Sequence, residues 1–314
     1  MIATAKKALR RWGIEEADCE LEAARENHVF RTSFQNEIFA LRLHRPGYRS
    51  DAELHSELYW MKELVGRGMS VPRPIPAVDG QYLHRVDDVQ TDVLTWLPGT
   101  PLGKTGEPLI GNTVEVFKDL GAKMAQLHNI SDDLKLPSDF SRCRWDLNGL
   151  VGSNPVWGNF WENPSLTADQ RRLFQYVRQN AVETLEPRLH ELDFGLIHAD
   201  MVRENILVDD GQISLIDFDD GGFGFRLFDV ATALIKNTGE PNYPELREAL
   251  ITGYRSKRPL DTRFLNLFIL LRAATYVGWV VERLAEDGST ARNRRFIEQT
   301  ERLAKEYLDT LTQK

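Results

Sequence analysis

Cysteine is scarce in this chain, and its scarcity limits the kinds of protein the chain can be. Only two cysteines occur in 314 residues, Cys19 and Cys143, and they lie far apart and outside any motif. A disulfide framework or a cysteine-based metal site needs more cysteines at closer, patterned spacings. We therefore expect two reduced thiols in a cytoplasmic protein.

Positive charge is also in deficit. The chain has 39 Lys and Arg against 47 Asp and Glu, which gives a formal net charge of −8. Because affinity for nucleic acids rests on clustered Lys and Arg, we do not expect a general nucleic-acid-binding protein. A nucleotide needs only a local positive pocket, so the net charge does not exclude one.

Long uninterrupted apolar runs are missing, as are internal repeats and low-complexity tracts. Residues 1–14 are mixed and charged, unlike a signal peptide. The most apolar stretch, residues 264–281, is interrupted by Asn266 and Arg272, which favours a buried helix over a membrane span. A content of 42% hydrophobic and 27% charged residues indicates a globular protein, and its length allows two lobes.

The residue pattern predicts strands early in the chain and helices later. After a short helix at 4–13, we expect strands at 19–24, 29–34, 37–44, 81–86 and 90–96, with a helix at 50–66 that begins at an N-cap, Ser50 or Asp51. Beyond the break at Leu97-Pro98-Gly99, we expect helices at 112–128 and 166–191, one hairpin, and further helices. This is an α+β pattern, and we place the domain boundary after Leu97, giving domains 1–97 and 98–314.

The most informative segment is residues 194–217, FGLIHADMVRENILVDDGQISLID. Residues 206–208 are apolar and favour a strand, Asp210-Gly211 is a strong hairpin turn, and residues 212–216 alternate polar and apolar. A hairpin folded about this turn would bring Asn205 beside Asp217 at its open end. The pattern therefore predicts that two oxygen-bearing side chains meet there.

These residue types suit phosphoryl transfer. Mg²⁺ is bound by a few protein oxygens together with phosphate oxygens and water, so Asn205 and Asp217 form a suitable pair. Asp200, five residues before Asn205, is placed to orient a hydroxyl and accept its proton. A lone His-x-Asp could be ordinary surface polarity. A kinase-like site is indicated far more specifically by the full string, which runs from His198 through Asn205 and is followed by two strands and residues 216–219 (IDFD).

This string resembles the catalytic and metal-binding segments of the aminoglycoside phosphotransferase-like superfamily, which includes choline and ethanolamine kinases, type II homoserine kinases and a bacterial stress-response protein kinase. Residues 221–234 (GGFGFRLFDVATAL) extend the resemblance. It implies a protein-kinase-like fold with a small antiparallel β N-lobe and a larger helical C-lobe. It also implies ATP and Mg²⁺ as cofactors, Asp200 as catalytic base, and Asn205 and Asp217 as metal ligands. Asp229 is implied to hold the catalytic loop, and a favourable position in a helix dipole is a compatible role.

The same resemblance implies the nucleotide contacts. Arg42 stands where the superfamily has a phosphate-contacting Lys or Arg, and Glu57 where it has that residue's partner, although solvated surface charges are the alternative. Residues 93–97 stand where the superfamily has the hinge, whose backbone near Thr95 and Leu97 would bind adenine. The alternative is that they form a plain edge strand that ends at a turn. The turn at 23–28 lacks the glycine-rich G-x-G-x-x-G pattern, and Asn27 is a candidate contact there.

The acceptor is the least defined part of the reaction. The candidate regions are residues 264–285 and 141–165, the second of which contains Trp145, Trp157 and Trp161. Tryptophan faces near carboxylates would suit an ammonium group, whereas packing anchors are an equal alternative. The expected partner is a small hydroxyl substrate, cationic or neutral, with homoserine or another amino alcohol as first candidate.

Three functions remain open: a small-molecule kinase, a stress-response-type Ser/Thr protein kinase, and a non-catalytic pseudokinase that acts as an interaction module. The intact Asp200, Asn205 and Asp217 argue against the pseudokinase, and the short stretch between 217 and 229 favours a metabolite over a protein. The sequence leaves open the oligomeric state and the choice of ATP over GTP.

Four further polar residues have open roles. We expect His198 to pack the catalytic turn rather than to transfer protons, and His128 to be a packed or capping histidine. Asp219 and Asp220 would form either a site for a cation or a solvated acidic turn.

Overall fold

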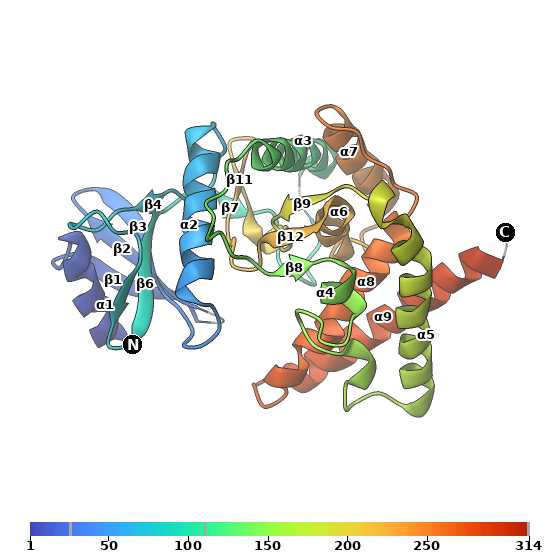
Figure 1. Cartoon of the computed structure of the whole chain (residues 1–314). Helices are drawn as coiled ribbons and strands as arrows, with labels where there is room; N and C mark the ends of the chain where they lie inside the picture. Colours follow the sequence, from blue (N-terminus) through green and yellow to red (C-terminus); the bar gives the residue numbers. More distant parts are fainter. Residues whose placement is uncertain (25–26, 110, 313–314) are drawn as a thin grey trace. The chain divides into compact units, whose positions relative to one another are not determined.

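The computed structural model describes residues 1–24, 27–109 and 111–312 (Figure 1). Its contacts divide the chain into two compact units, each assembled from separate segments. Unit 1 comprises Met1–Leu102, Asp133–Arg142 and Ile206–Asp219, and unit 2 comprises Gly103–Asp132, Cys143–Asn205 and Asp220–Lys314. The lobe boundary after Leu97 stays a prediction.

In the described part of unit 1, six strands form one antiparallel sheet in the order β1-β2-β3-β6-β4, with β5 also paired to β6. The strands are β1 (Asp18–Ala24), β2 (His28–Phe34), β3 (Glu37–Leu43), β4 (Pro74–Ile75), β5 (His84–Val86) and β6 (Val89–Thr95). Gln35 and Asn36 join β2 to β3, and both have positive φ, which is the geometry of a tight primed turn.

The sheet buries its apolar side chains against the N-terminal helix α1 (Ile2–Leu9) and the 3-10 helix η1 (Arg10–Trp12). Phe30, Leu41 and Val93 from three neighbouring strands share this core with Leu9 and Trp12. The alternation predicted for the strands therefore places one face in the core.

Helix α2 (Asp51–Gly66) lies alongside this sheet (Figure 1). It begins with a capping box: Ser50 Oγ accepts the N–H of Glu53 at 3.2 Å, and the Glu53 carboxylate accepts the N–H of Ser50 at 2.9 Å. These bonds satisfy donors that the first helical turn leaves unpaired. The helix starts where the sequence predicted.

The predicted hairpin is present in unit 1 as β10 (Ile206–Asp209) and β11 (Gln212–Leu215). Ile206 pairs with Leu215 at its open end, and the turn residues Asp210 and Gly211 both have positive φ. A short strand, β7 (Thr100–Pro101), adds to the other side of β10, which the sequence pattern did not predict.

Unit 2 is mainly helical. Its helices are α3 (Thr113–Asp132), α4 (Leu147–Val151), α5 (Ala168–Leu185), α6 (Arg226–Ile235), α7 (Tyr243–Arg255), α8 (Leu265–Trp279) and α9 (Ser289–Thr312), with 3-10 helices η2 (Phe160–Glu162), η3 (Glu186–Glu191), η4 (Arg203–Asn205) and η5 (Val281–Arg283). α3 packs along α7, and α8 packs against α6 and α9 (Figure 1). Glycines let α3 and α7 approach closely. A Cβ at Gly121 would overlap the carbonyl oxygen of Leu250, and one at Gly253 would overlap that of Lys118.

A small sheet in unit 2 supports the loop that carries Asp200. β12 (Gly222–Phe225) lies between β8 (Arg144–Trp145), to which it is parallel, and β9 (Phe194–Ile197), to which it is antiparallel. The stretch Leu265–Arg283 has the length and apolarity of a membrane span, but 78% of its most apolar window is buried within the protein. It forms a core helix, as expected, and antiparallel sheet followed by helices confirms the α+β prediction.

Candidate active site

The loop that follows β9 is held in an uncommon backbone conformation. Ala199, a residue with a Cβ, has φ 63°, which disfavours most side-chain-bearing residues. Asp229 of α6 holds this turn, because its carboxylate accepts the N–H of His198 at 2.9 Å and that of Ala199 at 2.6 Å. The backbone support expected from Asp229 is therefore present.

Asp229 is itself held by a buried chain of hydrogen bonds. His128 Nε2 lies 3.0 Å from the Asp229 carboxylate, and His128 Nδ1 lies 2.8 Å from the hydroxyl of Tyr254. Burial, with the nearby charge of Arg226, lowers the pKa of His128 to about 4. Burial would raise the pKa of Asp229, but the hydrogen bonds from His128 and from the backbone N–H of His198, with the electrostatic effect of both histidines, together outweigh it and the pKa is lowered. His128 is thus a packed histidine that supports the loop.

Both carboxylate oxygens of Asp200 are engaged. Oδ1 accepts a bond from Arg272 Nη2 at 2.8 Å, and Oδ2 accepts one from Asn205 Nδ2 at 2.7 Å. The Asp200 side chain is nevertheless 20% exposed, so a small molecule can reach it. His198 is buried, and its Nδ1 accepts the N–H of Asp200 at 3.3 Å, which matches its expected packing role.

The bonds of Asn205 orient its amide. Nδ2 donates to the backbone oxygen of Asp200 at 3.0 Å as well as to its carboxylate. With the nitrogen committed to Asp200, the amide oxygen is the atom that could bind a cation. This orientation fits the role of metal ligand, because Mg²⁺ takes oxygen donors.

Asp217 belongs to unit 1, two residues beyond the hairpin. It is exposed and has φ 67°, and such outliers gather at functional sites. Among the residues that the structure describes, no group of three or more His, Cys, Asp or Glu side chains is placed to hold a metal ion. The roles of Asn205 and Asp217 as metal ligands stay predictions, and Mg²⁺ in such a role commonly takes its remaining ligands from phosphate oxygens and water.

In unit 1, Arg42 forms the ion pair expected with Glu57. Arg42 Nη1 lies 2.7 Å from the Glu57 carboxylate, and Nε and Nη2 each lie 2.8 Å from the carboxylate of Asp92. Burial would raise the pKa of Asp92, but the charges and hydrogen bonds of Arg42 and His44 together outweigh it and the pKa lies well below its usual range. His44 Nε2 adds a bond of 2.7 Å to Asp92. Contact between Arg42 and phosphate stays a prediction.

Glu57 also links Arg42 to the segment that carries Asp217. Arg142 Nη1 donates to Glu57 at 3.1 Å, and its Nη2 donates to the backbone oxygens of Phe218 at 2.8 Å and Asp219 at 2.6 Å. Burial raises the pKa of Asp219, and the negative charge of Glu57 adds to this. Because Asp219 is buried, it is not part of a solvated acidic turn.

The predicted nucleotide contacts of the sheet also lie in unit 1. The N–H of Thr95 donates to the oxygen of Arg73 at 2.9 Å, and that of Trp96 donates to Ile38 at 3.1 Å. Leu97 carries the next backbone N–H, and contact between this segment and adenine stays a prediction. Asn27 Oδ1 accepts the N–H of Arg45 at 3.4 Å, while residues 25 and 26 of the expected turn lie outside the described residues.

The tryptophans of residues 141–165 are used in packing. Trp145 stacks on Phe228, with centroids 5.1 Å apart, and donates its indole N–H to the oxygen of Asp220 at 2.8 Å. The guanidinium of Arg272 lies 4.6 Å from the centroid of Trp157, and that of Arg178 lies 4.4 Å from Trp161. These contacts support the packing interpretation for all three.

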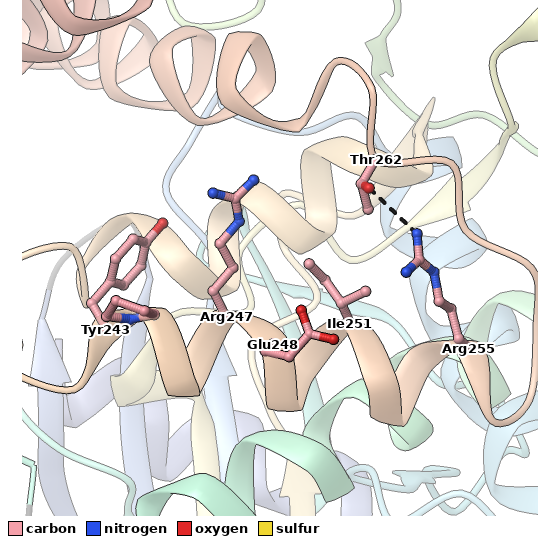
Figure 2. A pocket seen from close by; sticks show the side chains of 7 residues that line it. Tyr243, Arg247, Glu248, Ile251, Arg255 and Thr262 are labelled. Carbon is pink, nitrogen blue, oxygen red and sulfur yellow. Dashed lines mark hydrogen bonds between the residues drawn. The ribbon is translucent and has the colours of Figure 1, made fainter.

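A separate pocket of about 360 Å³ lies along α7 (Figure 2). Its lining combines two arginines and a glutamate with neutral polar and apolar side chains: Tyr243, Pro244, Arg247, Glu248, Ile251, Arg255 and Thr262. None of the predicted site residues lines it, so it is not the candidate active site.

Sequence reasoning missed Asp92, Arg142 and Arg272. Asp92 is the cross-strand partner of Arg42, which only the strand register reveals. Arg142 reaches Glu57 across 85 residues of sequence. Arg272 did carry a signal, because a lone charge inside the most apolar helix needs a partner.

Comparisons with known proteins show what the chain resembles. A profile described as phosphotransferase enzyme family matches residues 19–267, more than half of the chain. A homoserine kinase from Gluconobacter oxydans (strain 621H) is 30% identical over 244 residues, covering 75% of this chain and 71% of the relative.

Solved structures give the same picture. A microcompartment-associated aminopropanol kinase matches with a TM-score of 0.85 and 28% identity, over 99% of this chain and 98% of that one. An amicoumacin kinase, solved with AMP-PNP, Ca²⁺ and Ami, matches with a TM-score of 0.74 and 21% identity, over 95% of this chain and 92% of that one. These likenesses confirm the expected kinase-like fold.

Proposed function

Because this chain belongs to the phosphotransferase enzyme family, we propose that it is an ATP- and Mg²⁺-dependent kinase that phosphorylates the hydroxyl of a small amino alcohol. A small-molecule kinase acting on an alcohol group follows from the family and its named kinases. The nucleotide, the metal and the acceptor are the proposed parts. Its expected location is the cytoplasm, where Cys19 and Cys143, both free thiols, would stay reduced.

The observation that carries the proposal is the pairing of Asp200 with Asn205. Asn205 holds one oxygen of the Asp200 carboxylate through its amide nitrogen, and its amide oxygen would serve as the ligand for a cation. A positioned base beside a metal ligand is the minimum that hydroxyl phosphorylation requires, since catalysis of this reaction is largely positioning and charge stabilisation.

In the proposed reaction, Asp200 aligns the acceptor hydroxyl and takes its proton as the new O–P bond forms. The bond between the γ-phosphate and its bridging oxygen breaks, and ADP leaves. Asn205 and Asp217 would hold Mg²⁺, which neutralises charge on the phosphate oxygens when bound. Arg42, positioned by Glu57, would contact the phosphates, and backbone near Thr95 and Leu97 would contact adenine.

The acceptor class is inferred from relatives whose names specify homoserine and aminopropanol. Both acceptors carry an amine and a hydroxyl on a short chain. We therefore place L-homoserine and 1-amino-2-propanol ahead of choline, sugars and aminoglycosides as candidates.

The proposal is tested by ADP-release assays with ATP and Mg²⁺ and a panel of these acceptors. We expect release that depends on an amino alcohol, with a phosphate monoester product detected by ³¹P NMR. ADP release with peptides alone would favour a protein kinase. Mg²⁺-ATP binding in calorimetry without turnover on any acceptor would favour the pseudokinase.

A further inference from the structure

We propose that Arg272 of α8 is the positioning residue of Asp200, holding its carboxylate in the orientation that phosphoryl transfer requires. This inference rests on the proposed function, because it assigns Arg272 a task in that reaction. Arg272 donates a hydrogen bond directly to Asp200, so its action on the reaction would pass through Asp200.

The guanidinium of Arg272 is fixed by one hydrogen bond at each nitrogen. Nη2 donates to Asp200 Oδ1 at 2.8 Å, Nε to Thr232 Oγ1 at 3.0 Å, and Nη1 to Thr275 Oγ1 at 3.1 Å. Because the three bonds run in different directions within one rigid plane, the group cannot turn without breaking at least one of them. Asp200 therefore meets a donor with a fixed position.

Aromatic rings hold the same guanidinium from its faces. Its central carbon lies 4.2 Å from the ring centroid of Tyr276, 4.6 Å from that of Trp157 and 5.6 Å from that of Phe228. The Arg272 side chain is fully buried, while Asp200 remains partly exposed. The cation is thus enclosed, and only its carboxylate partner is accessible.

Burial of this kind argues for a task beyond stability. A buried ion pair is weak evidence for stabilisation, since well-packed apolar side chains often serve as well or better. An apolar residue at 272 would suit the surrounding rings, yet it would leave Asp200 Oδ1 without its donor. The arrangement makes sense if the orientation of Asp200 is what Arg272 provides.

The filled aromatic box also bears on the acceptor. Trp157 and Tyr276 would otherwise offer faces for a substrate ammonium group, but Arg272 already covers them. An amino-alcohol acceptor would therefore have its ammonium group recognised elsewhere, and its hydroxyl would approach Asp200 beside a fixed positive charge.

The test is Arg272→Met, which keeps most of the side-chain volume within the aromatic box but removes the charge and all three bonds. With L-homoserine or 1-amino-2-propanol as acceptor, we expect kcat to fall by about a hundredfold, the effect of a small misplacement of a catalytic group. The KM for ATP should change by less than about twofold, because the substitution removes no proposed contact with ATP and so leaves the binding of ATP in the ground state unchanged. Arg292→Met is the matched control, since Arg292 lies over Trp279 at 5.7 Å and should change neither constant.

Two further measurements separate positioning from mere stability. In an Asp200→Asn background, Arg272→Met should cause little additional loss of turnover, because residues that act as a unit are not additive. In Arg272→Ala, added guanidinium ion, well below denaturing concentrations, should restore part of the activity by filling the vacated space, whereas Arg272→Met should not respond. Full additivity, or an unchanged kcat in Arg272→Met, would overturn the proposal.

Crystal structures of the wild type and of Arg272→Met give a readout that needs no activity. We expect the Asp200 carboxylate to leave its position while Asp229 keeps its bonds to the backbone of His198 and Ala199. An Asp200 carboxylate that stays in place would refute the positioning role even if the wild type proved inactive. A wild type without turnover on any acceptor would instead refute the proposed function and leave this comparison decisive for Arg272.

Discussion

Asp200 receives a hydrogen bond on each carboxylate oxygen. Its replacement by asparagine keeps the size of the side chain but removes its charge and its capacity as a base. Asp200→Asn should lower kcat by about a hundredfold or more, the usual effect of losing a general base. Mg²⁺-ATP affinity, measured by calorimetry, should stay close to that of the wild type. Asp210→Asn, the same change in the exposed hairpin turn, serves as control, and normal turnover by Asp200→Asn would remove Asp200 from the mechanism.

Asp217 calls for a different substitution, because its φ of 67° is poorly tolerated by most residues but is accepted by asparagine. Asp217→Asn should weaken Mg²⁺-dependent ATP binding by about tenfold or more, since even indirect partners of a metal site change affinity that much. Raising the Mg²⁺ concentration should recover part of the loss. Asp209→Asn, at the far end of the same hairpin, should behave like wild type, and equal affinities for the two variants would exclude Asp217 as a ligand.

At this scale, the sequence predicted residues within short motifs better than partners brought in by tertiary structure. Asp200 and Asn205 lie five residues apart in one motif, and the support that Asp229 gives to the loop was implied by the family resemblance. Asp92 depends on the register of β3 against β6, and Arg142 depends on the return of residues 133–142 to unit 1. No periodicity in a single segment encodes either relation.

Helix α2 illustrates the scale of elements, because its cap secures the helix that carries Glu57. Ser50→Ala removes one half of the capping box and should lower stability by about 1 kcal/mol. Urea unfolding should show a lower midpoint. Hydrogen exchange should quicken at the backbone amide of Glu53, whose N–H donates to Ser50 Oγ. The exposed Ser153→Ala is the control, and unchanged exchange at Glu53 would show that the cap does not hold the first turn.

Elements long enough to show a repeating pattern of apolar residues were predicted well, and the shortest elements were not. β3, α2 and the β10–β11 hairpin match their predicted ranges to within about two residues, the accuracy with which any helix or strand end can be defined. β7 and β8 have two residues each, too few to show a period of two. Their pairing partners, β10 and β12, come from distant parts of the chain.

On the scale of the whole molecule, the residues with proposed roles are divided in sequence between the two compact units. Arg42, Glu57 and Asp217 belong to unit 1, whereas Asp200 and Asn205 belong to unit 2. The division falls between Asn205 and Ile206, within the motif itself. A sequence motif can place such residues next to one another in the chain, but which unit each joins is set by long-range packing.

Acid stability is a property of the whole molecule that one buried group should influence strongly. The pKa of His128 is lowered to about 4 in the folded protein from 6.5, so between these values the unfolded chain binds the proton more readily. The stability that goes with a neutral, buried His128 is therefore complete above about pH 6.5 and is lost as the pH falls toward 4. The loss should be on the order of 3 kcal/mol, since each pKa unit corresponds to about 1.4 kcal/mol.

The groups that face His128 favour this assignment. Asp229 has a lowered pKa and stays charged throughout this window, while Tyr254 has a raised pKa and stays neutral. Urea unfolding of His128→Asn between about pH 7 and pH 4.5 should give a flatter dependence of stability on pH than wild type, whatever its absolute stability. His55→Asn, which removes an exposed histidine of α2, should keep the wild-type slope. If His128→Asn kept that slope as well, protonation of His128 would not be what destabilises the fold in mild acid.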